Sequence, residues 1–166
     1  MLKESFVILY FPHALNVWKK FKLNPSVVLA QAAIESGWGE SSLATKANNF
    51  FGISAYGVSN EYWHGGKVET CPDGLCFRRY DTVENSFLDF GRLITTIYKN
   101  AAHVSFLPKS YAQEIAYSRY ISEKNGDNRE LYKDLLVRIE HSLQPLLRDK
   151  LALITSHKPI NVLSKI

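Results

Sequence analysis

The strongest candidate for chemistry is Glu35, a carboxylate at the predicted end of an apolar helix. Asn24 is a good helix cap and Pro25 suits a first turn, so we expect a helix over 24–36 that a Gly-Trp-Gly run then ends. The negative end of the helix dipole and apolar cover from Trp38 would both raise the pKa of Glu35. A carboxylic acid that stays protonated near neutral pH can protonate a leaving-group oxygen. The alternative is an ordinary solvated glutamate at a helix end.

Helical patterns account for most of the chain that must position this residue. Predicted helices cover 2–21 with an interruption near Pro12, 24–36 and 41–46. Asp81 and Glu84 form a capping-box pattern before a stripe predicted to be core, which consists of Val83, Phe87, Phe90, Ile94 and Ile97. Ser110 and Gln113 begin a further helix in the same way, and a last long helix carries Leu131, Leu135, Ile139 and Leu143. Gly, Tyr, Trp and short alternating runs predict a small β lobe over about 53–80.

Length, composition and charge favour one globular domain over residues 1–166. The chain is 46% hydrophobic and 13% aromatic, which is enough for a core. No apolar run reaches membrane-spanning length, and we expect no membrane insertion. The run Phe6–Phe11 is cut by Pro12, so no signal peptide is evident. A net charge of +4 permits attraction to polyanions, but no dense Lys/Arg patch predicts a nucleic-acid partner.

Two cysteines, Cys71 and Cys76, bracket a Pro-Asp-Gly-Leu turn between short strand-like runs. Cross-strand pairing would bring them within bonding distance, so we expect a disulfide and an oxidising compartment. The alternative is two free thiols in a reducing compartment. Two cysteines without paired histidines do not complete a zinc site, and no metal ligands are predicted.

Four blocks that occur in order carry a family resemblance: LAQAAIESGWGESSLATKANNFFGISA, WHGGKVET, FRRYDTVENSFLDFGRLI, and SYAQEIAYSRYISE with Tyr132 following. They resemble the peptidoglycan N-acetylglucosaminidases of glycoside hydrolase family 73, from about Pro12 to about Leu147. The resemblance implies an α+β, lysozyme-like fold in which a mainly helical lobe faces a small β-hairpin lobe across a cleft. It also implies hydrolysis of the β-1,4 bond after N-acetylglucosamine in cell-wall glycan strands, with no cofactor.

The resemblance further implies a second catalytic group and a catalytic tyrosine. Glu69 in KVET matches the β-lobe glutamate of the family, with Glu61 and Asp73 as rivals. Its role would be to hold the attacking water, to stabilise oxocarbenium charge, or to orient a 2-acetamido group that acts as nucleophile. Tyr120 in SRYIS would hydrogen-bond the acetamido group or the water, unless it only packs under the cleft.

Substrate contacts are expected from aromatic and amide side chains, namely Trp38, Asn48, Asn49, Tyr56 and Trp63. The aromatic rings can stack on sugar faces, although Trp38 is equally suited to packing beside the helix end. The asparagines would bind the sugar or cap the backbone.

Two other enzyme types and one silent module remain as alternatives. A lytic transglycosylase or a muramidase would act on the same polymer, and a catalytically silent wall-binding or secretion-assembly module would keep the cleft for docking. The presence of both Glu35 and Tyr120 argues against the silent module. The expected partners are peptidoglycan strands and an envelope-spanning machine. We expect a monomer in the periplasm, in the cell wall or outside the cell.

Overall fold

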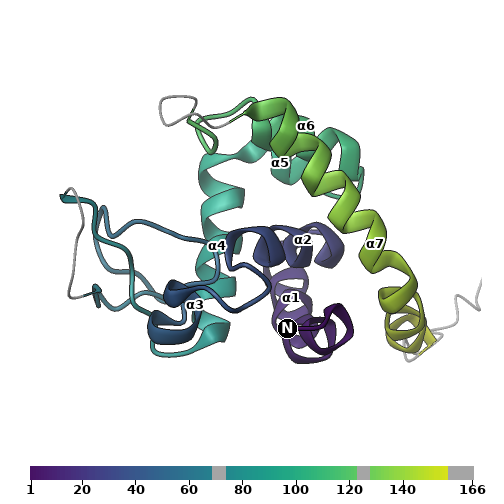
Figure 1. Ribbon diagram of the computed structural model, residues 1–166, viewed down its shortest axis with the longest axis horizontal. Coiled ribbons are helices and arrows are strands. Elements are labelled where there is room, and N and C mark those ends of the chain that lie inside the picture. Colours follow the sequence, from purple (N-terminus) through teal and green to yellow (C-terminus); the bar gives the residue numbers. More distant parts are fainter. Residues whose placement is uncertain (69–73, 123–127, 157–166) are drawn as a thin grey trace, which may run out of the picture.

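The computed structural model describes residues 1–68, 74–122 and 128–156, and this part of the chain is mainly helical. In chain order the helices are α1 (Lys3–Phe21), α2 (Pro25–Glu35), α3 (Ser42–Ala47), α4 (Val83–Ile97), α5 (Lys99–His103), α6 (Pro108–Ala116) and α7 (Arg129–Ser156). α1 and α2 lie at the centre, with α4 on one side and α7 on the other, while the segment between α2 and α4 projects away from α7 (Figure 1). No helix in the described ranges is long and apolar enough to cross a membrane.

Side-chain caps explain where two of the helices begin. Asn24 Oδ1 accepts a hydrogen bond from the Ser26 amide at 3.0 Å, and Pro25 occupies the first turn of α2. Ser41 caps α3 in the same way, as its hydroxyl accepts from the Ala44 amide at 3.1 Å. These starts agree with the helices predicted from the sequence.

Three other details of the predicted helices are wrong. α4 is capped by Thr82, because the Asp81 carboxylate contacts His64 Nδ1 at 2.6 Å instead. α6 begins at Pro108, whose fixed φ suits a first turn, before the predicted start at Ser110. α1 is continuous through Pro12, which faces solvent, where water can satisfy the carbonyl that loses its helical partner.

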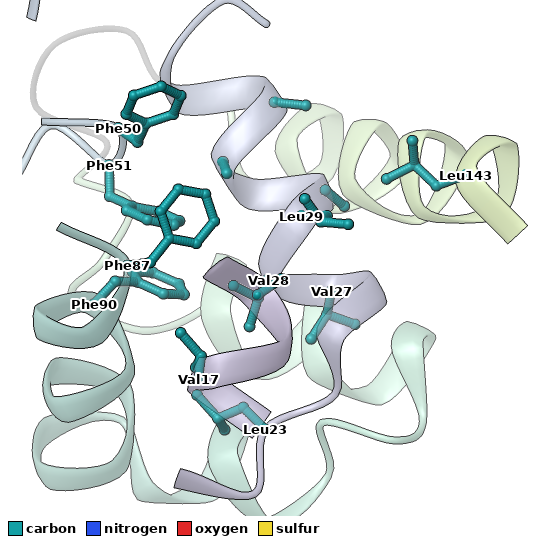
Figure 2. Packing of buried hydrophobic residues seen from close by; sticks show 14 of the residues in the cluster. Val17, Leu23, Val27, Val28, Leu29, Phe50, Phe51, Phe87, Phe90 and Leu143 are labelled. Atoms are coloured by element: carbon teal, nitrogen blue, oxygen red, sulfur yellow. The ribbon is translucent and has the colours of Figure 1, made fainter. Parts of the chain in front are cut away.

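α2 is the central helix of the core, because nine of its eleven residues are buried. Its side chains pack among those of α1, α4 and α7 (Figure 2). Phe51 stacks on Phe90 of α4, with ring centroids 3.9 Å apart and planes 8° apart. A helix buried on nearly all sides holds its C-terminal residue, Glu35, in a fixed place.

The predicted core stripe of α4 is correct at its centre and wrong at its C-terminal end. Phe87, Phe90 and Ile94 are fully buried, but Ile97 is 57% exposed. In α7, Leu143 is buried, whereas Leu131 is 67% exposed. Contacts of α7 with α2 and α6 select a different face of this helix, which consists of Leu136, Glu140, Leu143 and Leu147.

The predicted β-hairpin lobe is not present as strands within residues 53–68 and 74–80. Two isolated antiparallel bridges, Ser54 with Phe77 and Lys67 with Arg78, place two extended segments on either side of residues 76–79. Backbone hydrogen bonds join these segments, for example from the Arg78 amide to the Ile53 carbonyl at 2.9 Å, and side chains add further bonds. Asn49 Nδ2 donates to the carbonyls of Ile53 and Arg78 at 3.0 Å each, and its Oδ1 accepts from the Ile53 amide.

Candidate active site

Glu35 is the last residue of α2 and lines a cavity of about 510 Å³. The chain turns sharply after it, since Ser36 Oγ accepts from the Gly39 amide at 2.7 Å and Trp38 adopts a left-handed conformation with φ 59°. Because of this turn, the chain leaves the axis of α2 directly after Glu35, the residue that lines the cavity.

Two further predicted site residues line the same cavity. Tyr120 follows α6, and Tyr56 belongs to the segment between α3 and α4 and is 69% exposed. The structure thus brings Glu35, Tyr120 and Tyr56 together from three distant parts of the chain. A larger groove of about 1210 Å³ between α6 and α7 contains none of the predicted site residues.

Tyr120 presents a buried hydroxyl to this site. Among the described residues, its Oη has no hydrogen-bond partner, and its ring packs edge-on against Tyr98 with centroids 5.6 Å apart. Burial, followed by the charge of Glu35, raises the pKa of Tyr120 well above its ordinary value. The phenol is therefore neutral and keeps its proton available for a hydrogen bond.

Tyr132 on α7 contacts Glu35 directly, and sequence reasoning assigned it no role. Its hydroxyl donates to Glu35 Oε1 at 2.7 Å and accepts from Gln31 Nε2 at 3.2 Å. Gln31 is fully buried and lies one helical turn before Glu35 on α2. An amide at this spacing inside an apolar helix was a signal that could have indicated a polar neighbour for Glu35.

A buried ion pair, also missed in the sequence, supports the opposite wall of the cavity. The Asp89 carboxylate is fully buried on α4 and accepts from Arg78 at 2.6 Å, Tyr80 at 2.6 Å and Arg92 at 2.7 Å. Burial acts to raise the pKa of Asp89, but the hydrogen bonds from Tyr80 and Arg92 and the charges of both arginines hold it below its ordinary value. In the sequence, a carboxylate between two phenylalanines on the core face of α4 was the signal that could have indicated this buried ion pair.

Arg78 links the buried Asp89 carboxylate to backbone carbonyls of the segment that lines the cavity. Its guanidinium donates to the carbonyls of Ser54 at 3.1 Å and Tyr56 at 2.8 Å, and it lies 4.1 Å above the Trp63 ring. The position of Tyr56 therefore depends on the pair of Arg78 and Asp89.

The chain matches, over residues 11–144, the family Glucosaminidase, described as mannosyl-glycoprotein endo-beta-N-acetylglucosaminidase. The chain belongs to this family. The expectation of a glycoside hydrolase of family 73 is thereby confirmed.

Relatives of this glucosaminidase domain include two curated bacterial proteins. Peptidoglycan hydrolase FlgJ of Vibrio parahaemolyticus is 27% identical over 158 residues, covering 86% of this chain and 48% of that protein. A putative endo-beta-N-acetylglucosaminidase of Streptococcus pneumoniae serotype 4 is 50% identical over 108 residues, covering 64% of this chain and 16% of that protein. The chain thus spans about half, or less, of the curated relatives it matches.

The crystal structure of a peptidoglycan hydrolase from Sphingomonas sp. A1 has the same fold. It superposes with a TM-score of 0.63 at 25% identity and covers 97% of this chain and 99% of the other. The mainly helical architecture is therefore that of a peptidoglycan hydrolase domain.

Four of the five substrate-contact residues predicted for this glucosaminidase domain are engaged elsewhere. Trp38 packs edge-on against Phe6, and Asn48 Nδ2 donates to the Tyr80 carbonyl at 3.0 Å. Asn49 is buried and used by the backbone contacts given above, and Trp63 is 2% exposed, with its Nε1 donating to the Gly66 carbonyl at 2.7 Å. The geometry favours backbone capping for the asparagines and packing for Trp38.

Three predicted residues lie outside the described residues, namely Glu69, Cys71 and Asp73. Cys76 is disulfide-bonded, but the pairing with Cys71 stays a prediction. The rival carboxylate Glu61 is exposed and forms an ion pair with Lys20 of α1 at 3.0 Å. No group of three potential metal ligands occurs within residues 1–68, 74–122 and 128–156.

Proposed function

We propose that the protein hydrolyses the β-1,4 bond after N-acetylglucosamine in peptidoglycan strands, with Glu35 as the general acid. The observation that carries this proposal is the position of Glu35, at the end of a buried helix and in one cavity with Tyr120 and Tyr56. Family membership and the names of the relatives support peptidoglycan as the substrate.

Glu35 protonates the glycosidic oxygen while positive charge develops on the sugar ring. Tyr120 donates its buried hydroxyl to the acetamido group or to the attacking water, and Tyr56 offers an exposed ring to a sugar face. Glu69 is the second group, which holds the water, stabilises the oxocarbenium charge or orients the acetamido group. The family resemblance assigns Glu69 to a small β lobe, and the two backbone bridges in the same segment support such a lobe.

The proposed location and partner of the enzyme follow from this substrate. It works as a monomer in the periplasm, in the wall or outside the cell, and an envelope-spanning machine is its proposed partner. A disulfide between Cys71 and Cys76 fits such an oxidising compartment and would fasten the tip of the lobe.

Mass spectrometry of digested peptidoglycan tests the proposed reaction. A glucosaminidase leaves N-acetylglucosamine at the new reducing end, and a muramidase leaves N-acetylmuramic acid there. A lytic transglycosylase yields an anhydro product instead. Products of either other type would contradict the proposal, and unchanged peptidoglycan would favour the silent module.

Separate substitutions of Glu69 and Tyr120 test the roles proposed for these two residues. We expect Glu69→Gln to lower turnover by on the order of 100-fold, because the water or the developing charge loses its partner. Tyr120→Phe is expected to lower turnover by about tenfold without lowering the melting temperature, because the hydroxyl it removes has no partner among the described residues. Turnover and thermal melting are measured on the same samples.

Two rival carboxylates serve as controls for this test. Glu61→Gln and Asp73→Asn are expected to keep most activity. An indispensable Glu61 or Asp73 together with a dispensable Glu69 would reassign the second group.

A further inference from the structure

A one-way chain of hydrogen bonds from three helices ends on Glu35. The Tyr111 hydroxyl of α6 donates to Gln31 Oε1 of α2, and Gln31 Nε2 donates to Tyr132 Oη of α7 at 3.2 Å. The Tyr132 hydroxyl then donates to Glu35 Oε1 at 2.7 Å. Tyr111 and Gln31 are fully buried, so water does not compete for these bonds.

The direction of this chain follows from its donors and acceptors. A glutamine amide has one accepting end and one donating end, and a phenol has a single proton. Because Tyr111 occupies the oxygen of Gln31, the amide nitrogen faces Tyr132. The Tyr132 oxygen accepts from that nitrogen, and its one proton is directed at Glu35.

A fixed donor on Oε1 has two consequences for an acid at position 35. The acid proton is favoured on the other oxygen, Oε2, since Oε1 already accepts a hydrogen bond. When that proton leaves, the bond from Tyr132 becomes charge-assisted and stabilises the carboxylate that forms in the transition state. We propose that Tyr132 is a positioning residue for Glu35, held in its donating orientation by Gln31 and Tyr111. This inference rests on the proposed function, in which Glu35 is the general acid.

Several other polar groups lie around Glu35. Tyr111, Tyr120 and Tyr132 all have pKa values raised by burial and then by the charge of Glu35, so they are neutral donors near pH 7. Tyr98 and Arg78 line the same cavity, but the Arg78 guanidinium is already paired with Asp89. Tyr132 donates directly to the carboxyl group of Glu35.

Tyr132→Phe removes this one hydroxyl and keeps the ring. We expect kcat to fall about 10- to 100-fold with KM unchanged, as for loss of a hydrogen bond to a charged group. We also expect the alkaline limb of the pH profile of kcat to move to higher pH. The bond stabilises the ionised form of Glu35, and its loss keeps the acid protonated to a higher pH.

Tyr117→Phe is the matched control. The Tyr117 hydroxyl also donates to a glutamate, Glu130 of α7, but this pair lies on the surface away from the cavity. Its removal is expected to leave kcat, KM and the pH profile unchanged.

Gln31→Met provides a second, independent variant. It is expected to lower kcat and shift the alkaline limb in the same direction, since Tyr132 loses the partner that orients it. The effects of Gln31→Met and Tyr132→Phe on kcat should be less than additive, because both act through the bond to Glu35. Full additivity would overturn the inference.

The outcomes separate this inference from the proposed function. An active wild type and an inactive Glu35→Gln, together with unchanged kcat and pH profile in Tyr132→Phe, would overturn the positioning role alone. A lower kcat with an unmoved alkaline limb would indicate a merely structural role and would also overturn it. A wild type that does not cleave peptidoglycan would overturn the proposed function and this inference with it.

Discussion

Glu35→Gln is expected to lose at least about 100-fold of the activity on peptidoglycan while the protein still folds. Glutamine keeps the shape of the side chain at the end of α2 and removes the proton that the leaving oxygen needs. The buried part of α2, which packs the core, is untouched. Turnover and thermal melting of the purified variant provide the measurement.

Glu114→Gln is a suitable control for this variant, because Glu114 is exposed on α6. It is expected to retain full activity. Near-normal turnover in Glu35→Gln at an unchanged melting temperature would show that another group is the acid.

Asp89→Asn is expected to destabilise the fold by about 3 kcal/mol, as for breaking a buried ion pair from one side. The variant leaves the guanidinium of Arg78, whose side chain is 8% exposed, without its buried counter-ion. It also loosens the contacts of Arg78 with the backbone of Ser54 and Tyr56, so activity should fall with stability. Urea unfolding measures the change.

The pH dependence of unfolding provides a second readout for Asp89. Its pKa is lower in the folded chain than in the unfolded one, so its contribution is complete above about pH 4 and is lost as the pH falls through the folded value. Below about pH 4 the stability of Asp89→Asn should therefore decline less steeply with falling pH than that of the wild type.

Asp81→Asn is the matched control, since it removes a carboxylate that is paired with His64 on the surface. It is expected to leave the urea midpoint unchanged. Equal losses in Asp81→Asn and Asp89→Asn would contradict the structural role assigned to the buried pair.

Local features of the fold were predictable because their causes are local. The caps at Asn24 and Ser41 act on backbone amides a few residues away, and their helices begin as predicted. The cap of α4 was not predictable in this way. Asp81 and Thr82 are both good caps, and in the structure Thr82 caps the helix while Asp81 contacts His64, 17 residues away.

The expected β lobe illustrates the same limit on a larger scale. The alternating residues over 53–80 predict extended backbone, and the residues that form the two bridges are extended. Whether a ladder forms depends on partners, and here a few backbone bonds, such as that from the Arg78 amide to the Ile53 carbonyl, are joined by side-chain bonds from Asn49 and Arg78. Such pairing between distant residues cannot be deduced from periodicity.

The sequence by itself determined the helix that ends at Glu35 and, through four ordered blocks, the family of the chain. Both depend on residue types at short spacing along the chain, and such patterns can be identified from the sequence alone. Only the tertiary structure decided what surrounds Glu35. Tyr132 lies 97 residues away along the chain, and it contacts Glu35 because α7 packs against α2. A hydrogen bond needs atoms within about 3 Å, and only the packing of distant elements brings them that close.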